Sequence, residues 1–275
     1  MFTAFHRRVL AVLVPFLAFA AFPTLTSANH SWGPYHWART SNPFTLKLGD
    51  NVSSAWDAYL ATASTDWTFS SVLNTTIVAG GTTDSPKKCR PTSGRVEVCS
   101  ANYGGAWLGL AQIWVSGSHI YQATSKMNDF YFNKAKYNKP QWRRFVLCQE
   151  VGHTFGLDHQ NENFYDANLG SCMDYTSNPL GPPSNEHPNP HDYEQLELIY
   201  NAHPDGSTTV AQIAAKAPPG MSEIDFSGPG QWGRLIRSTN RGLTQLYELD
   251  FGGGHKLFTF VIWAEGEEGG RGNRH

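Results

Sequence analysis

One short stretch decides how this chain folds: QEVGHTFGLDH, from Gln149 to His159. Positions 149 and 153 are four residues apart, so on a helix Gln149 and His153 share one face, with Glu150 beside them. Gly156 can adopt the left-handed conformation that ends a helix, which lets the chain bend and bring His159 back toward that face. A catalytic zinc needs three protein ligands and one open position, so the stretch predicts a zinc site.

The sequence around this stretch predicts an α+β fold. The helix that carries it begins near Pro140, a residue favoured in the first helical turn, and runs to about Phe155. Apolar and alternating runs predict strands before it, and helical periodicity predicts one helix before it and one after it. The predicted strands are residues 44–48, 70–78, 96–99, 108–115 and 119–124, with a shorter extended segment at 130–132; the two other helices are residues 53–63 and 192–202.

A second segment, Ser171-Cys172-Met173-Asp174-Tyr175, lies one loop beyond the first. Together the two segments resemble the metzincin zinc peptidases, whose long signature is H-E-x-x-H-x-x-G-x-x-H, here with Gln149 at the first histidine position. The second segment is similar to the Met-turn of that family. The resemblance covers about residues 37–203, and the order of elements suits the matrixin-like branch. It implies a mixed twisted sheet, a zinc helix and a C-terminal helix, with a cleft between two subdomains.

The resemblance also implies roles for individual residues. His153 and His159 correspond to zinc ligands, Glu150 to the general base that activates a metal-bound water, and Met173 to the methionine beneath the metal. In the astacin-like and serralysin-like branches, a tyrosine two residues after that methionine contacts the metal or the developing oxyanion. Tyr175 has this spacing, and we expect it either in that catalytic role or as an ordinary core tyrosine.

Gln149 departs from the family pattern and leaves several arrangements open. An amide oxygen is a weaker zinc ligand than imidazole. Zinc could be held by His153, His159 and Gln149, or by Tyr175 in place of Gln149. Alternatively, the site binds no metal and the fold serves as a binding protein. Two histidines beyond the Met-turn are further candidate ligands: His187 and His191.

The N-terminal residues 1–28 predict an export signal. Arg7 and Arg8 precede an apolar run at residues 9–22, and small residues follow at 26–28, as before a cleavage site. The apolar run is shorter than the roughly 20 residues that span a bilayer. We therefore expect a secreted, soluble protein with no stable membrane anchor, a retained anchor being the alternative.

Export changes the meaning of the four cysteines. An even number in an oxidising compartment favours two disulfides, although free buried thiols are the alternative. Three pairings are possible. The nearest neighbours in sequence, Cys89 with Cys99 and Cys148 with Cys172, are the predicted pairs because each would tie a loop to a neighbouring element.

The remaining features concern partners and domains. A formal net charge of −2 gives no reason to expect a nucleic-acid partner. Composition changes after the metzincin-like domain, residues 29–205. Residues 206–264 predict a small β unit around the glycine turn at 252–254, and residues 265–275 predict a disordered tail. No cysteine-switch propeptide is evident, so any latency must arise in another way.

These patterns together predict a secreted, monomeric zinc endopeptidase acting on protein or peptide substrates. The alternative, from a different functional class, is a catalytically inactive binding protein on the same fold, because of Gln149.

We expect the mature chain to begin near Asn29 and to contain no free thiol. Sequencing the N-terminus of the secreted protein and titrating the native protein with a thiol reagent test both points. A mature protein that begins at Met1, or one with four reactive thiols, would contradict them.

Overall fold

The computed structural model describes residues 1, 29–82, 85–201, 205, 207–218, 220–221, 226 and 228–267. The predicted signal segment therefore lies almost wholly outside the described residues, as does most of the predicted tail. Among the residues described, no helix is long and apolar enough to cross a membrane.

A nine-stranded mixed sheet forms the framework. Its spatial order is β3-β2-β4-β6-β5-β9-β8-β7, and β1 pairs with β6 outside this path. The pairs β2/β3, β2/β4, β4/β6 and β1/β6 are parallel, whereas the pairs from β6 through β5, β9 and β8 to β7 are antiparallel. The strands are β1 (His36–Trp37), β2 (Phe44–Asn51), β3 (Leu73–Ala79), β4 (Arg95–Ala101), β5 (Trp107–Ser116), β6 (His119–Asn128), β7 (Arg234–Thr239), β8 (Thr244–Gly252) and β9 (His255–Trp263).

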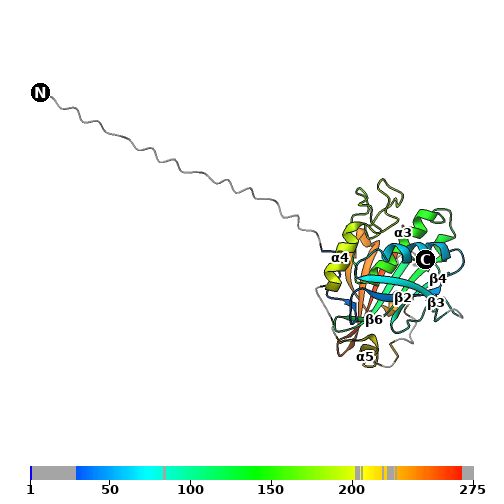
Figure 1. Ribbon diagram of the computed structural model, residues 1–275. Helices are drawn as coiled ribbons and strands as arrows, with labels where there is room; N and C mark the ends of the chain where they lie inside the picture. The colour runs from blue at the N-terminus through cyan, green and yellow to red at the C-terminus, as the bar shows by residue number, and fades with distance from the viewer. Residues whose placement is uncertain are drawn as a thin grey trace.

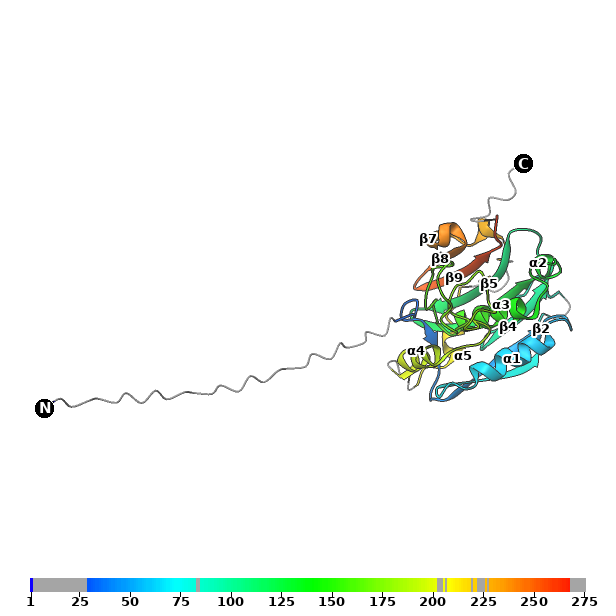
Figure 2. The same ribbon diagram turned by 90° about the horizontal axis from the view of Figure 1, so that it is seen from above.

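Among the described residues, five α-helices accompany the sheet: α1 (Asp57–Trp67), α2 (Asp129–Phe132), α3 (Pro140–His153), α4 (Pro190–Asn201) and α5 (Val210–Ala214). Two short 3₁₀ segments, Pro229–Gln231 and Asn240–Gly242, frame β7. Helices α1 and α3 pack against each other and against the sheet (Figures 1 and 2). The mixed α+β fold predicted from the sequence is thereby confirmed.

One predicted extended segment is wrong. Residues 130–132 lie in the short helix α2 because the side chain of Asn128 accepts a hydrogen bond from the backbone N–H of Phe130, at 3.2 Å. A side-chain acceptor of this kind satisfies a free N–H at a helix start and so favours the helical turn. Helix α1 also begins later than predicted, at Asp57 instead of Ser53, and continues to the buried Trp67.

The three C-terminal strands extend the same sheet. β9 pairs with β5 from Trp107↔Trp263 to Ser116↔His255, and β8 and β7 follow outward (Figure 2). The predicted glycine turn connects β8 to β9. β5 is consequently an interior strand with β6 on one side and β9 on the other.

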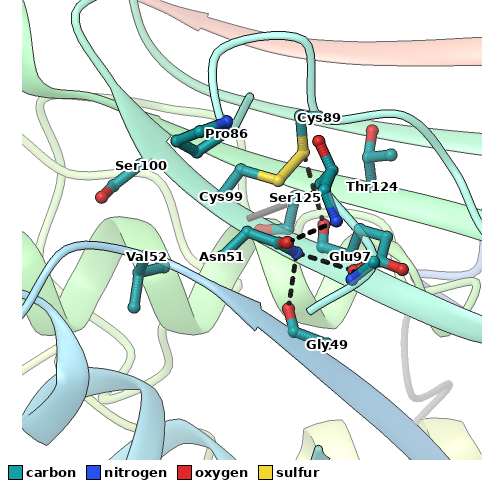
Figure 3. The surroundings of a disulfide bond; sticks show 12 residues. Gly49, Asn51, Val52, Pro86, Cys89, Glu97, Cys99, Ser100, Thr124 and Ser125 are labelled. Carbon is teal, nitrogen blue, oxygen red and sulfur yellow. Dashed lines mark hydrogen bonds between the residues drawn. A yellow bond between two sulfur atoms is a disulfide. The ribbon is translucent and has the colours of Figure 1, made fainter. Parts of the chain in front are cut away.

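Both predicted disulfides are present, and none of the described cysteines is free. Cys89–Cys99 holds the loop after β3 against β4, where the carboxylate of the buried Glu97 accepts a 2.6 Å hydrogen bond from the Asn51 side chain (Figure 3). Cys148–Cys172 joins α3 to the Met-turn segment directly. The second bridge therefore links the two sequence motifs by a covalent bond.

Helix α3 is buried along its C-terminal half and is fixed by two tryptophans. Trp67 of α1 donates from Nε1 to the carbonyl of Cys148, at 3.2 Å, and Trp37 of β1 donates to the carbonyl of Thr154, at 2.8 Å. The second bond satisfies one of the carbonyls that a helix end leaves without a helical partner. Both indoles are fully buried, so these bonds form away from competing water.

Gly156 turns the chain after α3. The helix ends at His153, two residues earlier than predicted, and Gly156 follows with a φ of +97°. A Cβ atom at this position would lie 2.4 Å from the backbone oxygen of Tyr35. Only glycine satisfies both conditions, because L-residues strain at positive φ and the neighbouring backbone cannot move aside.

We expect Gly156→Ala to lower the free energy of unfolding by roughly 3 kcal/mol, the sum of backbone strain and a backbone clash. Gly117→Ala is the matched control: φ is +60° there, but nothing lies within 4 Å of the added Cβ, so only about 1 kcal/mol should be lost. Urea unfolding of the two variants measures the difference. Equal losses would show that the contact with Tyr35 contributes nothing.

Candidate metal and catalytic site

The two predicted histidine ligands meet at the end of α3. The Nε2 atoms of His153 and His159 lie 3.2 Å apart. Nδ1 of His153 is 2.8 Å from the carbonyl oxygen of Leu157, which can only accept, so the proton resides on Nδ1 and the lone pair on Nε2. Such a bond from the second ring nitrogen orients a histidine for metal binding.

The spacing of these nitrogens fits a zinc ion. Zn–N bonds of about 2.0–2.1 Å in a tetrahedral site place two ligand nitrogens about 3.3 Å apart. Burial lowers the pKa of His153 well below its usual value, and the neighbouring His159 lowers it further. The ring of His153 is therefore neutral, which is the form that binds metal.

The segment 171–175 is bonded to the loop that follows His159. The backbone N–H of Gln160 donates to the carbonyl of Met173, at 2.7 Å, and that of Tyr175 donates to the carbonyl of Asn161, at 3.0 Å. Met173 is fully buried. A Cβ atom at Gly152 would lie 2.6 Å from the Met173 sulfur, so glycine is required for this close approach.

Glu150 lies next to the histidine pair in sequence but is sealed from solvent. Its exposed fraction is 0%, and neither carboxyl oxygen has a hydrogen-bond partner among the described residues. Burial raises the pKa of the Glu150 carboxyl well above its usual value, which favours the protonated form. The side chain packs against β5, where a Cβ atom at Gly109 would lie 2.3 Å from Glu150 Oε1.

Gln149 is also fully buried, and both its amide oxygen and its amide nitrogen lack partners among the described residues. An unpaired buried amide costs free energy, because it has lost its bonds to water without gaining others. It stands one helical turn before His153, on the same face. A cation near the two histidines would give the amide oxygen a partner, so the orphaned amide fits the weak third ligand proposed from the sequence.

Tyr175 lies beside the site. Its ring centre is 5.6 Å from that of His159, and its hydroxyl donates a 3.3 Å hydrogen bond to the carbonyl of Leu243. An apolar pocket adjoins it, with Trp142 and Phe145 of α3 on one side and Ile262 of β9 on another. The hydroxyl is thus near the histidines while it bonds to the C-terminal part of the chain.

The C-terminal strands cover the site. Phe260 of β9 stacks on the ring of His153, with ring centres 4.2 Å apart and planes 2° from parallel. Arg237 of β7 forms a two-pronged ion pair with Asp158, the residue before His159, with both N–O distances at 2.5 Å. His153 is 1% exposed as a result.

Carboxylates adjoin His159, and other histidines lie away from the pair. Asp158, His159 and Glu162 bring three potential ligand atoms within 4.8 Å of one another, and Arg237 neutralises part of this group from β7. His187, a predicted alternative ligand, instead lies 2.7 Å from the Asp66 carboxylate. His191, the other alternative, packs edge-on against the ring of His30.

A third group joins β1 to β6. His36 and His119 are register partners in these strands, and both ring Nε2 atoms face Asp205 Oδ1, at 3.2 Å and 2.7 Å. Arg39 donates to the other carboxylate oxygen, at 3.1 Å. Hydrogen bonds and an ion pair account for this cluster, which fastens the chain beyond α4 to the sheet.

Three residues of the site were not predicted from the sequence: Gly109, Arg237 and Phe260. An isolated glycine inside an apolar strand marks a close backbone approach, so Gly109 carried a usable signal. Arg237 and Phe260 carried none, because they reach the motif only through the pairing of strands far apart in the chain.

Comparison of the sequence with models of known protein families and with curated proteins gave no match.

We expect Gln149→His to tighten zinc binding at least about tenfold, because imidazole is a stronger zinc ligand than a neutral amide and even indirect changes at zinc sites shift affinity about 10–100-fold. Competition with a chromophoric chelator measures the affinity. Gln160→His is the matched control, since it adds an imidazole just beyond the motif. If the native protein already holds one zinc tightly and Gln149→His leaves that affinity unchanged, Gln149 is not the weak ligand.

Proposed function

We propose that this chain is a secreted zinc-dependent endopeptidase of metzincin type. The observation that carries the proposal is the 3.2 Å approach of the His153 and His159 Nε2 atoms, with the second nitrogen of His153 held by a backbone carbonyl. The segment 171–175, which is similar to the Met-turn, is bonded to the same loop, and the disulfide between Cys148 and Cys172 holds it to α3.

The site residues would divide the work of peptide hydrolysis. Zinc would be held by His153 and His159, with Gln149 as a weaker third ligand, and would supply Lewis-acid polarisation of the scissile carbonyl. Glu150 would accept a proton from the attacking water and pass it to the leaving nitrogen. The Tyr175 hydroxyl would donate a hydrogen bond to the oxyanion once it is free of Leu243.

Glu150 must be ionised to act as a base, and its burial opposes this. Entry of water or a cation beside the carboxyl would restore the ionised form, because either one compensates the lost hydration. The working state of the site is therefore more open than the arrangement in which Glu150 is fully buried.

A second function is favoured by one observation. The complete burial of Glu150 and Gln149 beneath β9 also suits a protein that keeps the fold and has no hydrolytic activity. Such a protein would bind partners through its outer surface, and its Glu150 would be replaceable without functional loss.

Glu150→Gln distinguishes the two functions. If Glu150 is the base, the variant retains zinc and fold but loses hydrolysis of an unstructured protein such as casein by at least about 100-fold. Because glutamine has no charge to bury, the free energy of unfolding should not fall. Zinc content, casein hydrolysis with and without chelator, and urea unfolding are the measurements.

Glu194→Gln, on the exposed side of α4, is the control and should leave hydrolysis unchanged. Purified protein with no bound zinc and no chelator-sensitive hydrolysis would favour the inactive binding protein. Equal turnover by Glu150→Gln and the native chain would remove Glu150 from the mechanism.

A further inference from the structure

The strand nearest Glu150 would be a sheet edge without the C-terminal strands. Within the region before β7, β5 is bonded on one side only, to β6. Its other side is filled by β9, which pairs with it antiparallel from Gly109 to Ser116, with one register shift between Trp107 and Gly109. Gly109, against which Glu150 packs, lies opposite Ile262 of β9.

An unpaired strand edge beside a hydrolytic site is where an extended peptide binds most readily. Its free N–H and C=O groups pair with the peptide backbone, and pockets alongside take the side chains. β9 uses the same groups on β5, and Ile262 lines the pocket beside Tyr175. β9 and an extended peptide therefore exclude each other.

Side-chain contacts fasten the C-terminal strands to the zinc motif at three points. Phe260 of β9 covers His153, and the carbonyl of Leu243 holds the Tyr175 hydroxyl. Arg237 of β7 clasps Asp158 with two charged hydrogen bonds. The first two contacts engage His153 and Tyr175, which have roles in the proposed reaction. The third engages the residue next to His159.

We propose that β7–β9 form a built-in inhibitor: β9 occupies the peptide-binding edge of β5, and Arg237 holds the strands down on the zinc motif. This inference rests on the proposed endopeptidase function, because an inhibitor needs an activity to restrain. It supplies a route to latency that involves no cysteine switch.

The attachment of strands β7–β9 to the site is weakest at the outer strand, β7. Most residues of β7 are exposed or half-buried, and β7 is the last strand of the sheet. The Arg237 side chain is 35% exposed, so its ion pair can be broken without opening the core. β9, by contrast, is almost wholly buried, and removing it would expose a large apolar surface. Release therefore begins at Arg237 rather than at β9.

Arg237→Gln tests the ion pair between Arg237 and Asp158 with little threat to the fold. We expect the amide hydrogens of β9 to exchange with solvent about tenfold faster, as expected for the loss of a partly exposed, charge-assisted pair. Casein hydrolysis by the zinc-loaded full chain should rise by a similar factor. Adding Glu150→Gln to this variant should abolish the increase.

Arg234→Gln is the matched control. Arg234 lies on the same strand, but its partner is Glu248 of β8 at 3.4 Å, away from the zinc motif. This variant should match the native chain in both β9 exchange and hydrolysis. Phe260→Leu is a second test from the covering side: it keeps an apolar side chain but loses the stacked ring on His153, and hydrolysis should rise.

The outcomes separate the inhibitor from the function itself. Hydrolysis that depends on Glu150 in the native chain and does not rise in Arg237→Gln or Phe260→Leu would overturn the inhibitor while the endopeptidase stands. Faster β9 exchange in Arg237→Gln with no hydrolysis by any variant would overturn the endopeptidase and the inhibitor together. Equal rates of β9 amide hydrogen exchange in Arg237→Gln and Arg234→Gln would show that the Arg237–Asp158 ion pair does not hold the strands down.

Discussion

The close approach of α3 to its neighbours is the constraint on which the rest of the structure depends. The helix carries Gln149, Glu150 and His153 into a fully buried position, and this requires contact distances that a Cβ atom would prevent. Gly109 admits Glu150 beside β5, and Gly152 admits the Met-turn sulfur. A Cβ atom at Gly109 would also lie 2.7 Å from Val146, and one at Gly152 would lie 2.7 Å from the ring of the buried Trp67, so the dense interior resists either substitution. Tryptophan N–H groups then fix the helix at the carbonyls of Cys148 and Thr154, and a disulfide fixes it at Cys148.

The buried end of α3 concentrates polar groups that the described protein leaves without partners. The Gln149 amide and the Glu150 carboxyl are buried and unbonded, and the two histidine Nε2 atoms face each other. Burial of the Gln149 amide and the Glu150 carboxyl is costly, because each has lost its hydrogen bonds to water without gaining others among the described residues. A cation, entering water or both would relieve the cost. Both the chemistry of these ligand groups and the free-energy cost of burying them therefore favour a bound cation or water at this site.

The C-terminal strands protect the edge of β5 and at the same time cover the histidine pair. An exposed edge at β5 would invite pairing with other chains, and β9 removes that hazard by continuing the sheet. The same pairing covers the histidines with Phe260 and brings Arg237 to the motif loop. Edge protection and closure of the site are thus one structural feature. In the proposed endopeptidase, substrate access depends on how readily the outer strands separate from the site.

The sequence by itself determined the local features: the helix that carries Gln149 and His153, the turn at Gly156, the two disulfide pairs and most strands. These depend on residue spacing, backbone preference and short chain separation, all of which a linear sequence contains. It failed at residues 130–132, where a hydrogen bond from the backbone N–H of Phe130 to the Asn128 side chain favours a helical turn in a segment of strand-like composition. It predicted that His159 would return to His153, and the two rings do meet, but it left open whether His187 or His191 would join them; these two lie instead beside Asp66 and His30. Only the tertiary structure decided that β9 lies along β5, because strand pairing between distant segments depends on three-dimensional packing and leaves no periodic signal in either strand. For the same physical reason, the burial of Glu150 was beyond the sequence.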